Sequence, residues 1–320
     1  MKQSTRRHVL GLVAAAALPF AAMAQGPNFP TKPVELVVPY PAGGGTDVLG
    51  RAFALAAVKH LPQPLIVINK PGAAGAIGWA DVLNGKEPGY KIALLATDLM
   101  TQPNMGLTKI TYQDFTPIAR LNYDPAAITV RADAPWKTVE EFVAAAKKGN
   151  FSVGNGGNGS TWHLAAAAIE DKTGAKFNHI PFAGANPAAL SLLGGHIEAI
   201  TVSAAEVYPH VAAGKLKILG VMSDQRIKGF ENVPTLKERG LDIQVGTWRG
   251  LAVPKNTPPE IVAALRAATA KTVQEQSLRD ALDKQNMGYA YAEGDAFGAV
   301  MARDHEFYKG LIQKLGLKGQ

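Results

Sequence analysis

Short apolar segments alternate with longer segments of helical periodicity along most of the chain. The apolar segments predict strands at residues 34–39, 65–69, 91–96, 128–131, 151–154, 177–181, 199–203 and 217–222. Beyond Thr257 the pattern predicts helices that are interrupted only by a turn at residues 288–294. Strands and helices that alternate in this way are typical of an α/β architecture with a largely parallel sheet.

Two helix starts have the spacing of a capping box, in which threonine is followed three residues later by glutamate. These pairs are Thr138 with Glu141 and Thr257 with Glu260. The second pair adds a proline at the first helical position, where its missing N–H has no cost. We therefore predict that helices begin after Thr138 and after Thr257.

Four of the predicted strands run into loops of small residues that then open a helix. The loops read YPAGGGTD (residues 40–47), NKPGAAGAIG (69–78), GNGGNGST (154–161) and PFAGANPAA (181–189). Such a loop leaves backbone N–H groups uncovered, and the first four N–H groups of a helix have no partner within it. Glycine allows a ligand to approach closely, and the helix dipole favours negative charge. The pattern therefore predicts a site for an anionic ligand, although glycine-rich turns also occur in α/β folds for tight packing alone.

The triple glycine predicts a specific contact. We expect the amides of Gly43, Gly44 and Gly45 and the hydroxyl of Thr46 to face a carboxylate. In Gly44→Val the new side chain would cover these amides, and valine could not adopt the positive φ expected there. Asp47 follows in the first turn of the helix. It either caps that helix or accepts hydrogen bonds from a ligand and so sets selectivity.

Two enzymatic readings remain as alternatives. Gly154, Gly156 and Gly159 match the G-x-G-x-x-G fingerprint of dinucleotide-binding folds, but the following strand carries no carboxylate to hold a ribose. Ser160 and His163 could form a nucleophile and base of a hydrolase, but no third orienting residue can be identified. His163 could equally pack or form a hydrogen bond at the rim of a cleft. The preferred reading has no catalytic residue, no metal and no cofactor.

The first 24 residues read as an export signal. Lys2, Arg6 and Arg7 precede a 14-residue apolar run, and Ala22-Met23-Ala24 is a cleavage site. The run is shorter than the roughly 20 residues that span a bilayer. The paired arginines also suit a twin-arginine signal, so the route stays open. We therefore predict cleavage after Ala24 and a location in the periplasm.

Composition narrows the function further. Without its three basic signal residues the chain keeps 30 basic and 26 acidic residues, which leaves a net charge of +4. This scattered excess gives no support to nucleic-acid binding, but it would help to attract a small anion. The chain has no cysteine, which excludes disulfides and thiol chemistry. The 296 residues after the signal exceed the usual limit of about 250 for a single core, so two lobes are expected.

Seven segments together resemble the substrate-binding proteins of tripartite tricarboxylate transporters, also called the Bug family of periplasmic receptors. They are PYPAGGGTD, INKPGAAGAIG, GNGGNGSTWHLAA, HIPFAGANPAALSLLGGHIEA, AAGKLKILGVMSDQR, VPTLKERG and WRGLAVPKNTP, and they cover essentially the whole mature chain. The resemblance implies a type II periplasmic binding protein fold, in which two α/β lobes joined by crossing strands close on a ligand. It also implies a carboxylate ligand, membrane transporter subunits as partners and a monomeric receptor.

The resemblance implies lobe 1 at residues 25–124 and 246–320 and lobe 2 at residues 125–245. It places the ligand site on the glycine-rich loops and the end of the third strand. With the candidates above, the predicted site comprises Tyr40, Gly43, Gly44, Gly45, Thr46, Asp47, Ala73, Gly75, Thr97, Asn155, Gly159, Ser160, Thr161, His163, Phe182 and Gly184. Tyr40, Phe182 and Trp248 could wall the pocket, although an aromatic residue at a strand end is more often part of the core.

Two segments depart from the family pattern. The family more often has tyrosine and then lysine or arginine at the positions of Phe182 and Ala183, and the GNGGNGSTWH loop carries two asparagines and a tryptophan. Both departures favour a ligand whose far end is less polar than that of citrate, for instance an aromatic or aliphatic acid.

Overall fold

The computed structural model describes residues 29–317, so the predicted export signal lies outside the described residues. The strands are β1 Val34–Val38, β2 Leu65–Asn69, β3 Lys91–Ala96, β4 Phe115–Arg131, β5 Ser152–Asn155, β6 Asn178–Pro181, β7 Ala199–Ser203, β8 Leu216–Val221, β9 Gly246–Pro254 and β10 Tyr289–Glu293. The α-helices are α1 Gly45–Ala57, α2 Ala76–Leu83, α3 Asp98–Thr101, α4 Val139–Ala146, α5 Thr161–Thr173, α6 Ala185–Leu193, α7 Ala204–Ala212, α8 Pro259–Thr272, α9 Gln276–Lys284 and α10 Gly294–Leu315.

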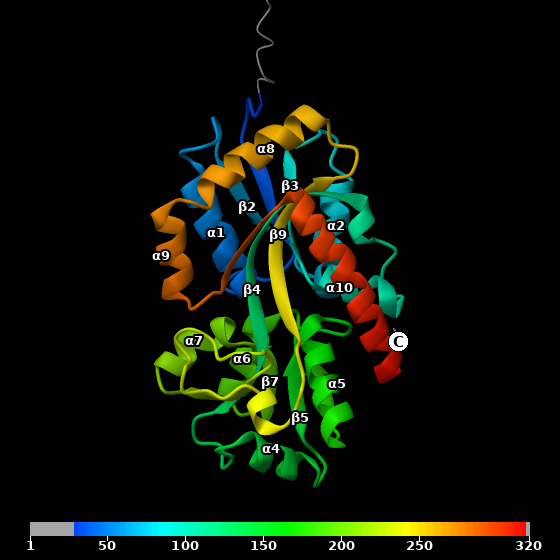
Figure 1. The fold of residues 1–320 in the computed structure, drawn as a ribbon, viewed down its shortest axis with the longest axis vertical. Coiled ribbons are helices and arrows are strands. Elements are labelled where there is room, and N and C mark those ends of the chain that lie inside the picture. Colours follow the sequence, from blue (N-terminus) through cyan, green and yellow to red (C-terminus); the bar gives the residue numbers. More distant parts are fainter. Residues whose placement is uncertain (1–28, 318–320) are drawn as a thin grey trace, which may run out of the picture.

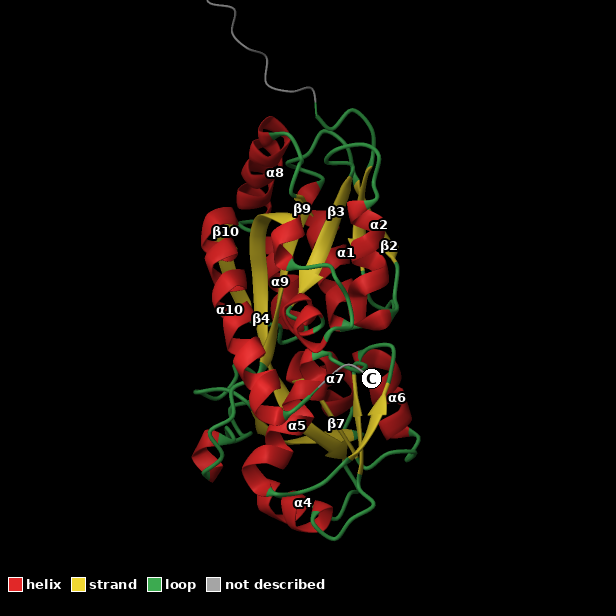
Figure 2. Ribbon diagram, turned by 90° about the vertical axis from the view of Figure 1, so that its right-hand side faces the viewer, coloured by secondary structure: helices red, strands yellow, loops and turns green. Residues whose placement is uncertain are grey.

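The strands form one mixed sheet in the order β2-β1-β3-β9-β4-β7-β5-β6, with β8 and β10 also paired to β4. At one end β1 pairs in parallel with β2 and β3, and at the other β5 pairs in parallel with β6 and β7. Figures 1 and 2 show these two ends as separate α/β lobes, one above the other. The predicted α/β architecture with two lobes is therefore observed.

Two long strands, β4 and β9, run antiparallel from one lobe into the other (Figure 1). β4 pairs with β9 along its first part, from Phe115 to Pro125, and with β7 and β8 from Ala126 onward. These pairings are compatible with the lobe boundaries near residues 124 and 245, which stay a prediction. The sequence pattern had located only the last residues of β4, because Pro117 and Pro125 are residues that usually exclude a central strand. It had also missed β9, whose partners β3 and β4 are distant in the chain.

The C-terminal segment differs from the prediction in one place. Residues 289–293, where a turn was expected, form strand β10, which pairs antiparallel with β4. The expected helices flank β10 in the chain, with α8 and α9 before it and α10 after it. α8 and α9 pack on α1 in the first lobe. α10 crosses toward the second lobe, where Lys314 Nζ lies 2.7 Å from Asp171 Oδ2 of α5. The end of the chain therefore braces the two lobes on one side (Figure 2).

Only one of the two expected capping boxes supplies a cap. Thr138 Oγ1 accepts a hydrogen bond from the Glu141 N–H at 3.2 Å, as predicted, while the Glu141 carboxylate accepts from the Lys137 N–H instead of from Thr138. The predicted helix after Thr257 is present as α8 and begins with a proline, but the predicted cap is wrong. Pro258 occupies the N-cap position, and the Thr257 hydroxyl has no hydrogen-bond partner among residues 29–317.

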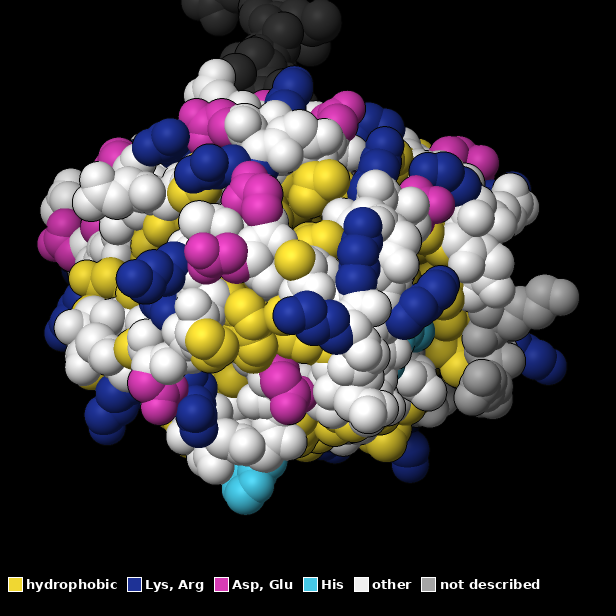
Figure 3. Space-filling model, turned by 90° about the horizontal axis from the view of Figure 1, so that it is seen from below, with side chains coloured by type: hydrophobic (Ala, Val, Ile, Leu, Met, Phe, Trp, Pro, Cys, Tyr) yellow, Lys and Arg dark blue, Asp and Glu magenta, His cyan; other side chains and the backbone are white. Residues whose placement is uncertain are grey.

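The lobes are held by ordinary apolar packing. Buried clusters cover both faces of the sheet and include Trp79 and Leu95 in the first lobe and Phe142 and Ile200 in the second. No helix in residues 29–317 combines the length and the hydropathy that crossing a bilayer requires. On the end of the molecule near α4, basic, acidic and apolar side chains are interspersed (Figure 3), so the positive excess is not gathered into one patch on this face.

Candidate ligand site between the lobes

A cavity lies where the carboxyl ends of the parallel strands of the two lobes meet. In α/β sheets this edge is the usual place for ligands. Its lining residues are Tyr40, Pro41, Gly44, Gly45, Thr46, Ala96, Asp98, Gly156, Trp162, Gly184, Ala185, Asn186, Glu206, Thr247 and Arg249. The cavity measures about 30 Å³. At roughly 10–15 Å³ for each water, that is room for about two water molecules.

Two helices begin at this cavity without a side-chain cap, one from each lobe. α1 of the first lobe follows Gly44 and α6 of the second follows Gly184, and neither N-cap forms a side-chain hydrogen bond. Within residues 29–317, the N–H groups of Gly45, Thr46, Ala185 and Asn186 donate to no protein acceptor. These N–H donors and the positive ends of the two helix dipoles are therefore available to bind an anion.

Two further helices begin nearby, and the protein itself satisfies their first turns. At the start of α5, the backbone N–H and the hydroxyl of Thr161 both donate to Asp98 Oδ1, at 2.7 and 2.8 Å. At the start of α7, Ser203 and Glu206 form a capping box in which each side chain accepts from the backbone N–H of the other residue. The carboxylates of Asp98 and Glu206 therefore occupy the positions that an anionic ligand would take at α5 and α7.

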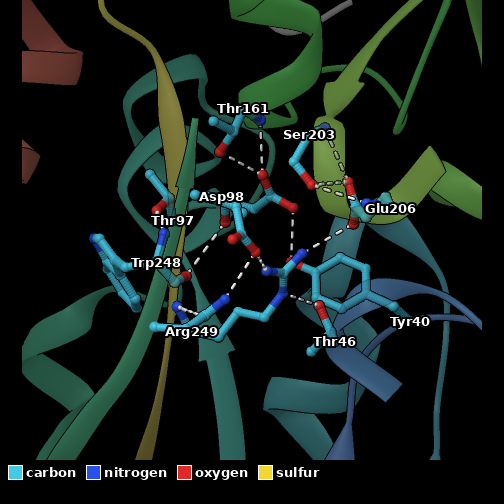
Figure 4. Close-up of polar contacts among 12 residues, drawn as sticks. Tyr40, Thr46, Thr97, Asp98, Thr161, Ser203, Glu206, Trp248 and Arg249 are labelled. Carbon is cyan, nitrogen blue, oxygen red and sulfur yellow. Dashed lines mark hydrogen bonds and ion pairs between the residues drawn. The ribbon is translucent and has the colours of Figure 1, made fainter. Parts of the chain in front are cut away.

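Arg249 of β9 is the cation among the lining residues, and Figure 4 shows its guanidinium directed at Thr46 and Glu206. Its Nη1 lies 2.5 Å from Asp124 Oδ2, and its Nη2 lies 2.9 Å from Glu206 Oε1. Its Nε donates to Thr46 Oγ1 at 2.8 Å. Only 1% of Arg249 is exposed. The guanidinium therefore joins the first lobe, the crossing strands and α7 of the second lobe.

Burial shifts the ionisation of the lining residues. It raises the pKa of Asp98, against the donors Thr161 and Tyr40, and it raises the pKa of Glu206, against Arg249. The pKa of Tyr40 is also well above its ordinary value, because of burial and of Asp98, whose Oδ2 accepts the Tyr40 hydroxyl at 2.6 Å. Burial opposes the charge of Arg249, but Glu206 and Asp124 raise its pKa. The acidic groups of the cavity are therefore harder to ionise than the same groups in water.

Of the predicted site residues, Tyr40, Gly44, Gly45, Thr46 and Gly184 line this cavity. The reason given for Gly44 was wrong in one respect. Its φ is −80°, and a Cβ there would meet only the Pro41 carbonyl oxygen, at 3.6 Å. The sterically demanding position is Gly45, where a Cβ would lie 2.9 Å from Arg249 Nη2 and 2.9 Å from Glu206 Cγ.

The other predicted residues of the first lobe lie outside the lining. Asp47 accepts hydrogen bonds from the Gly43 N–H and from the side chains of Arg51 and Asn69, each at about 3 Å, so the Gly43 amide is already used. The capping role that was weighed for Asp47 is not observed, because its carboxylate accepts from these three residues and from none of the first-turn N–H groups of α1 among residues 29–317. Thr97 Oγ1 accepts from the Trp248 N–H at 2.9 Å. Ala73 and Gly75 lie in a short 3-10 turn before α2.

The predicted residues of the second lobe, apart from Gly184, lie outside the lining of the cavity. Asn155 Oδ1 accepts from the Gly157 N–H, and Phe182 packs against the core. Ser160 Oγ accepts from the backbone N–H of His163, whose ring Nδ1 in turn accepts from the Gly159 N–H. Ser160 and His163 therefore do not form the hydroxyl–imidazole pair that the hydrolase reading needs.

The structure also accounts for glycines of the dinucleotide-binding fingerprint in another way. A Cβ at Gly154 would lie 2.6 Å from Ile197 Cδ1, and one at Gly159 would lie 2.5 Å from Leu107 Cδ1. Two glycines of the fingerprint are therefore explained by close packing, and only Gly156 reaches the cavity.

Trp248, a possible wall, is buried against Phe297 and contributes no lining, whereas Trp162 does. Within the part of the chain that the structure describes, no group of three acidic or histidine side chains is placed to hold a metal ion.

Sequence reasoning missed the charged lining residues Asp98, Glu206 and Arg249. One signal was available, because Ser203 and Glu206 have the same capping-box spacing that was noticed at Thr138. Arg249 stands in the WRGLAVP segment, which was noted only as a family motif. Nothing in the local pattern shows that this arginine points into a cavity.

Residues 49–317 match the family model of the tripartite tricarboxylate transporter family receptor. The chain belongs to this receptor family. Among its relatives, the UPF0065 protein in the gbd 5′ region of Cupriavidus necator is 37% identical over 98% of both chains. Protein BugT of Bordetella pertussis is 28% identical over 97% of both. The predicted family is therefore confirmed.

Two solved structures bear on the conformation of this receptor. A TctC solute-binding protein from Polaromonas without ligand is 84% identical, with 89% of this chain and 99% of that chain covered and a TM-score of 0.68. MatC from Rhodopseudomonas palustris with bound malate is 25% identical, with 89% and 100% covered and a TM-score of 0.82. These similarities confirm the predicted two-lobed fold of periplasmic binding proteins.

Proposed function

We propose that this receptor is exported to the periplasm, captures a small carboxylate between its lobes and delivers it to membrane subunits of a tripartite transporter. The observation that carries the proposal is the pair of uncapped helix starts. The free amides of α1 come from one lobe and those of α6 from the other, and both face the same cavity. A carboxylate that accepts from both sets would link the lobes, so binding would favour closure.

The similar structures support a closing motion. The 84% identical Polaromonas protein, solved without ligand, superposes less well on this chain than the 25% identical malate complex does. A high identity with a low TM-score is expected when two copies of one fold differ in the angle between their lobes. The small cavity supports the same motion, because a carboxylate of more than a few atoms enters only when the lobes separate.

The central part of the proposal is tested by titration calorimetry on the mature protein. The test panel contains citrate, malate, glutamate, adipate, terephthalate and short monocarboxylates, each with the matching primary amide as a control. We expect at least one acid to bind and its primary amide to bind much more weakly, since the backbone N–H groups at the starts of α1 and α6 favour a negatively charged acceptor. If no carboxylate binds, or if acid and amide bind alike, the proposal is wrong.

Export and delivery need separate tests. Fractionation of cells that express the full chain should recover the protein from the periplasm with a new N-terminus at Gln25. Uptake of the radiolabelled ligand by cells should fall when the gene is deleted and should recover when it is restored. Recovery from the cytoplasm with an intact N-terminus would contradict the proposed export.

A further inference from the structure

We infer that Asp98 and Glu206 determine the ligand class. The ligand would carry one carboxylate at the α1 and α6 side of the cavity and a hydrogen-bond donor, an ammonium or hydroxyl group, at the Asp98 and Glu206 side. A second carboxylate would be rejected there. This inference rests on the proposed function and narrows it from carboxylates in general to amino acids and hydroxy acids.

The cavity has two chemically different sides. Gly44, Gly45 and Thr46 at the start of α1 and Ala185 at the start of α6 line it with backbone N–H groups that have no acceptor among residues 29–317. Asp98 and Glu206 line the same cavity with carboxylates. A ligand that satisfies both sides must offer an acceptor to one and a donor to the other.

The hydrogen-bond partners of Asp98 are neutral. Among residues 29–317, its oxygens accept from Thr161 and Tyr40, and its side chain still lines the cavity. The nearby cation, Arg249, is already ion-paired with both Asp124 and Glu206. The guanidinium that lines the cavity is therefore already paired with the protein's own carboxyl groups, and it has no unpaired charge to offer a second carboxylate of the ligand.

A dicarboxylate would meet a penalty on this side. Asp98 is 7% exposed and the side chain of Glu206 is 6% exposed, and repulsion between like charges is stronger in such a site than in water. Burial already raises the pKa of both carboxyl groups, and a second ligand carboxylate at this side would meet the same desolvation together with their charge. An ammonium group would instead be attracted, and a hydroxyl group would donate to either carboxylate.

The test uses two matched series in calorimetry on the mature protein. The first is succinate, 3-aminopropanoate, 3-hydroxypropanoate and propanoate, and the second is glutarate, 4-aminobutanoate, 4-hydroxybutanoate and butanoate. Within each series only the far group changes, from carboxylate to ammonium, hydroxyl or hydrogen. We expect the amino or hydroxy acid of at least one series to bind at least tenfold more tightly than its dicarboxylate and its unsubstituted acid.

The variants Asp98→Asn and Glu206→Gln identify the residues responsible. Both keep an acceptor oxygen for Thr161 or Ser203, and circular dichroism will show that they fold. We expect each to reduce the preference for the donor over the dicarboxylate at least tenfold. Asp295→Asn, whose side chain is 92% exposed on α10, is the matched control and should leave the preference unchanged.

The inference is overturned if succinate or glutarate binds as tightly as its amino and hydroxy counterparts, or if only larger di- or tricarboxylates bind. It is also overturned if both folded variants keep the wild-type preference. Each of these results leaves the proposed receptor function intact. That function fails when no carboxylate binds or when an acid and its primary amide bind alike, so the two failures are distinguishable.

Discussion

Glu206 Oε1 lies 2.9 Å from Arg249 Nη2, and this buried ion pair joins the first turn of α7 in the second lobe to strand β9, which runs between the lobes. The same guanidinium contacts Asp124 on the other crossing strand and Thr46 on α1 of the first lobe. One side chain therefore connects α1 of the first lobe, both crossing strands and α7 of the second lobe. A loss of this side chain should affect both stability and closure.

We predict that Arg249→Leu lowers the free energy of unfolding by about 3–5 kcal/mol, because it leaves the carboxylates of Asp124 and Glu206 buried without their cation. The matched control is Arg226→Leu, which removes a pair with Glu238 whose two side chains are each 45% exposed. That change should cost less than about 1 kcal/mol. Urea unfolding followed by circular dichroism measures both values, and equal losses for the two variants would contradict the role given to Arg249.

Gly45 provides a test of the cavity geometry. In Gly45→Ala the new Cβ would lie 2.9 Å from Arg249 Nη2, so the guanidinium must shift and the lobes cannot close fully. We expect carboxylate affinity to fall at least tenfold, which is about 1.4 kcal/mol. In Gly44→Ala the φ of −80° is allowed and the nearest contact is 3.6 Å, so affinity should change less than threefold. The reverse ranking in calorimetry would show that the cavity is built differently.

His163 predicts a pH dependence of stability. Burial, and next the neighbouring His179, lower the pKa of His163 to about 4, compared with 6.5 for the ordinary side chain. Between these values the unfolded chain binds a proton that the folded chain does not. The stabilising contribution is therefore complete above pH 6.5 and is lost as the pH falls toward 4, by about 3 kcal/mol in total.

The variant His163→Asn isolates this contribution, since its side-chain oxygen can still accept from the Gly159 N–H. Urea unfolding of both proteins at pH 7.5, 5.5 and 4.5 gives the comparison. The wild type should lose more stability than the variant between pH 7.5 and 4.5. Parallel pH profiles would mean that His163 is protonated in the folded protein at the same pH as in the unfolded chain.

The sequence predicted the fold well where the pattern was local. Strands such as β1 and β7 are short apolar runs bounded by turn residues, and the helix starts after them carry glycine or serine. β9 and most of β4 were missed because they are long crossing strands whose partners are distant in the chain. Pro117 and Pro125 further hid β4, since proline is tolerated there only at positions that the final pairing defines.

The glycine-rich loops were predicted to gather at one place, and Gly44, Gly45, Thr46 and Gly184 do line the cavity. The sequence could not show which helix starts the protein satisfies by itself. Ser160 and Asp98 do so at α5, and Ser203 and Glu206 do so at α7. That distinction depends on side chains brought from other strands, and it decides which side of the cavity accepts an anion.

We expect the uncapped starts of α1 and α6 to hold the ligand carboxylate between the lobes. This expectation can be checked in a crystal structure of the mature protein with its tightest-binding carboxylate. Both carboxylate oxygens should lie within hydrogen-bond distance of backbone N–H groups from both helix starts, at Gly45 or Thr46 on one side and Ala185 or Asn186 on the other. A carboxylate that contacts only one lobe, or that lies outside this cavity, would contradict it.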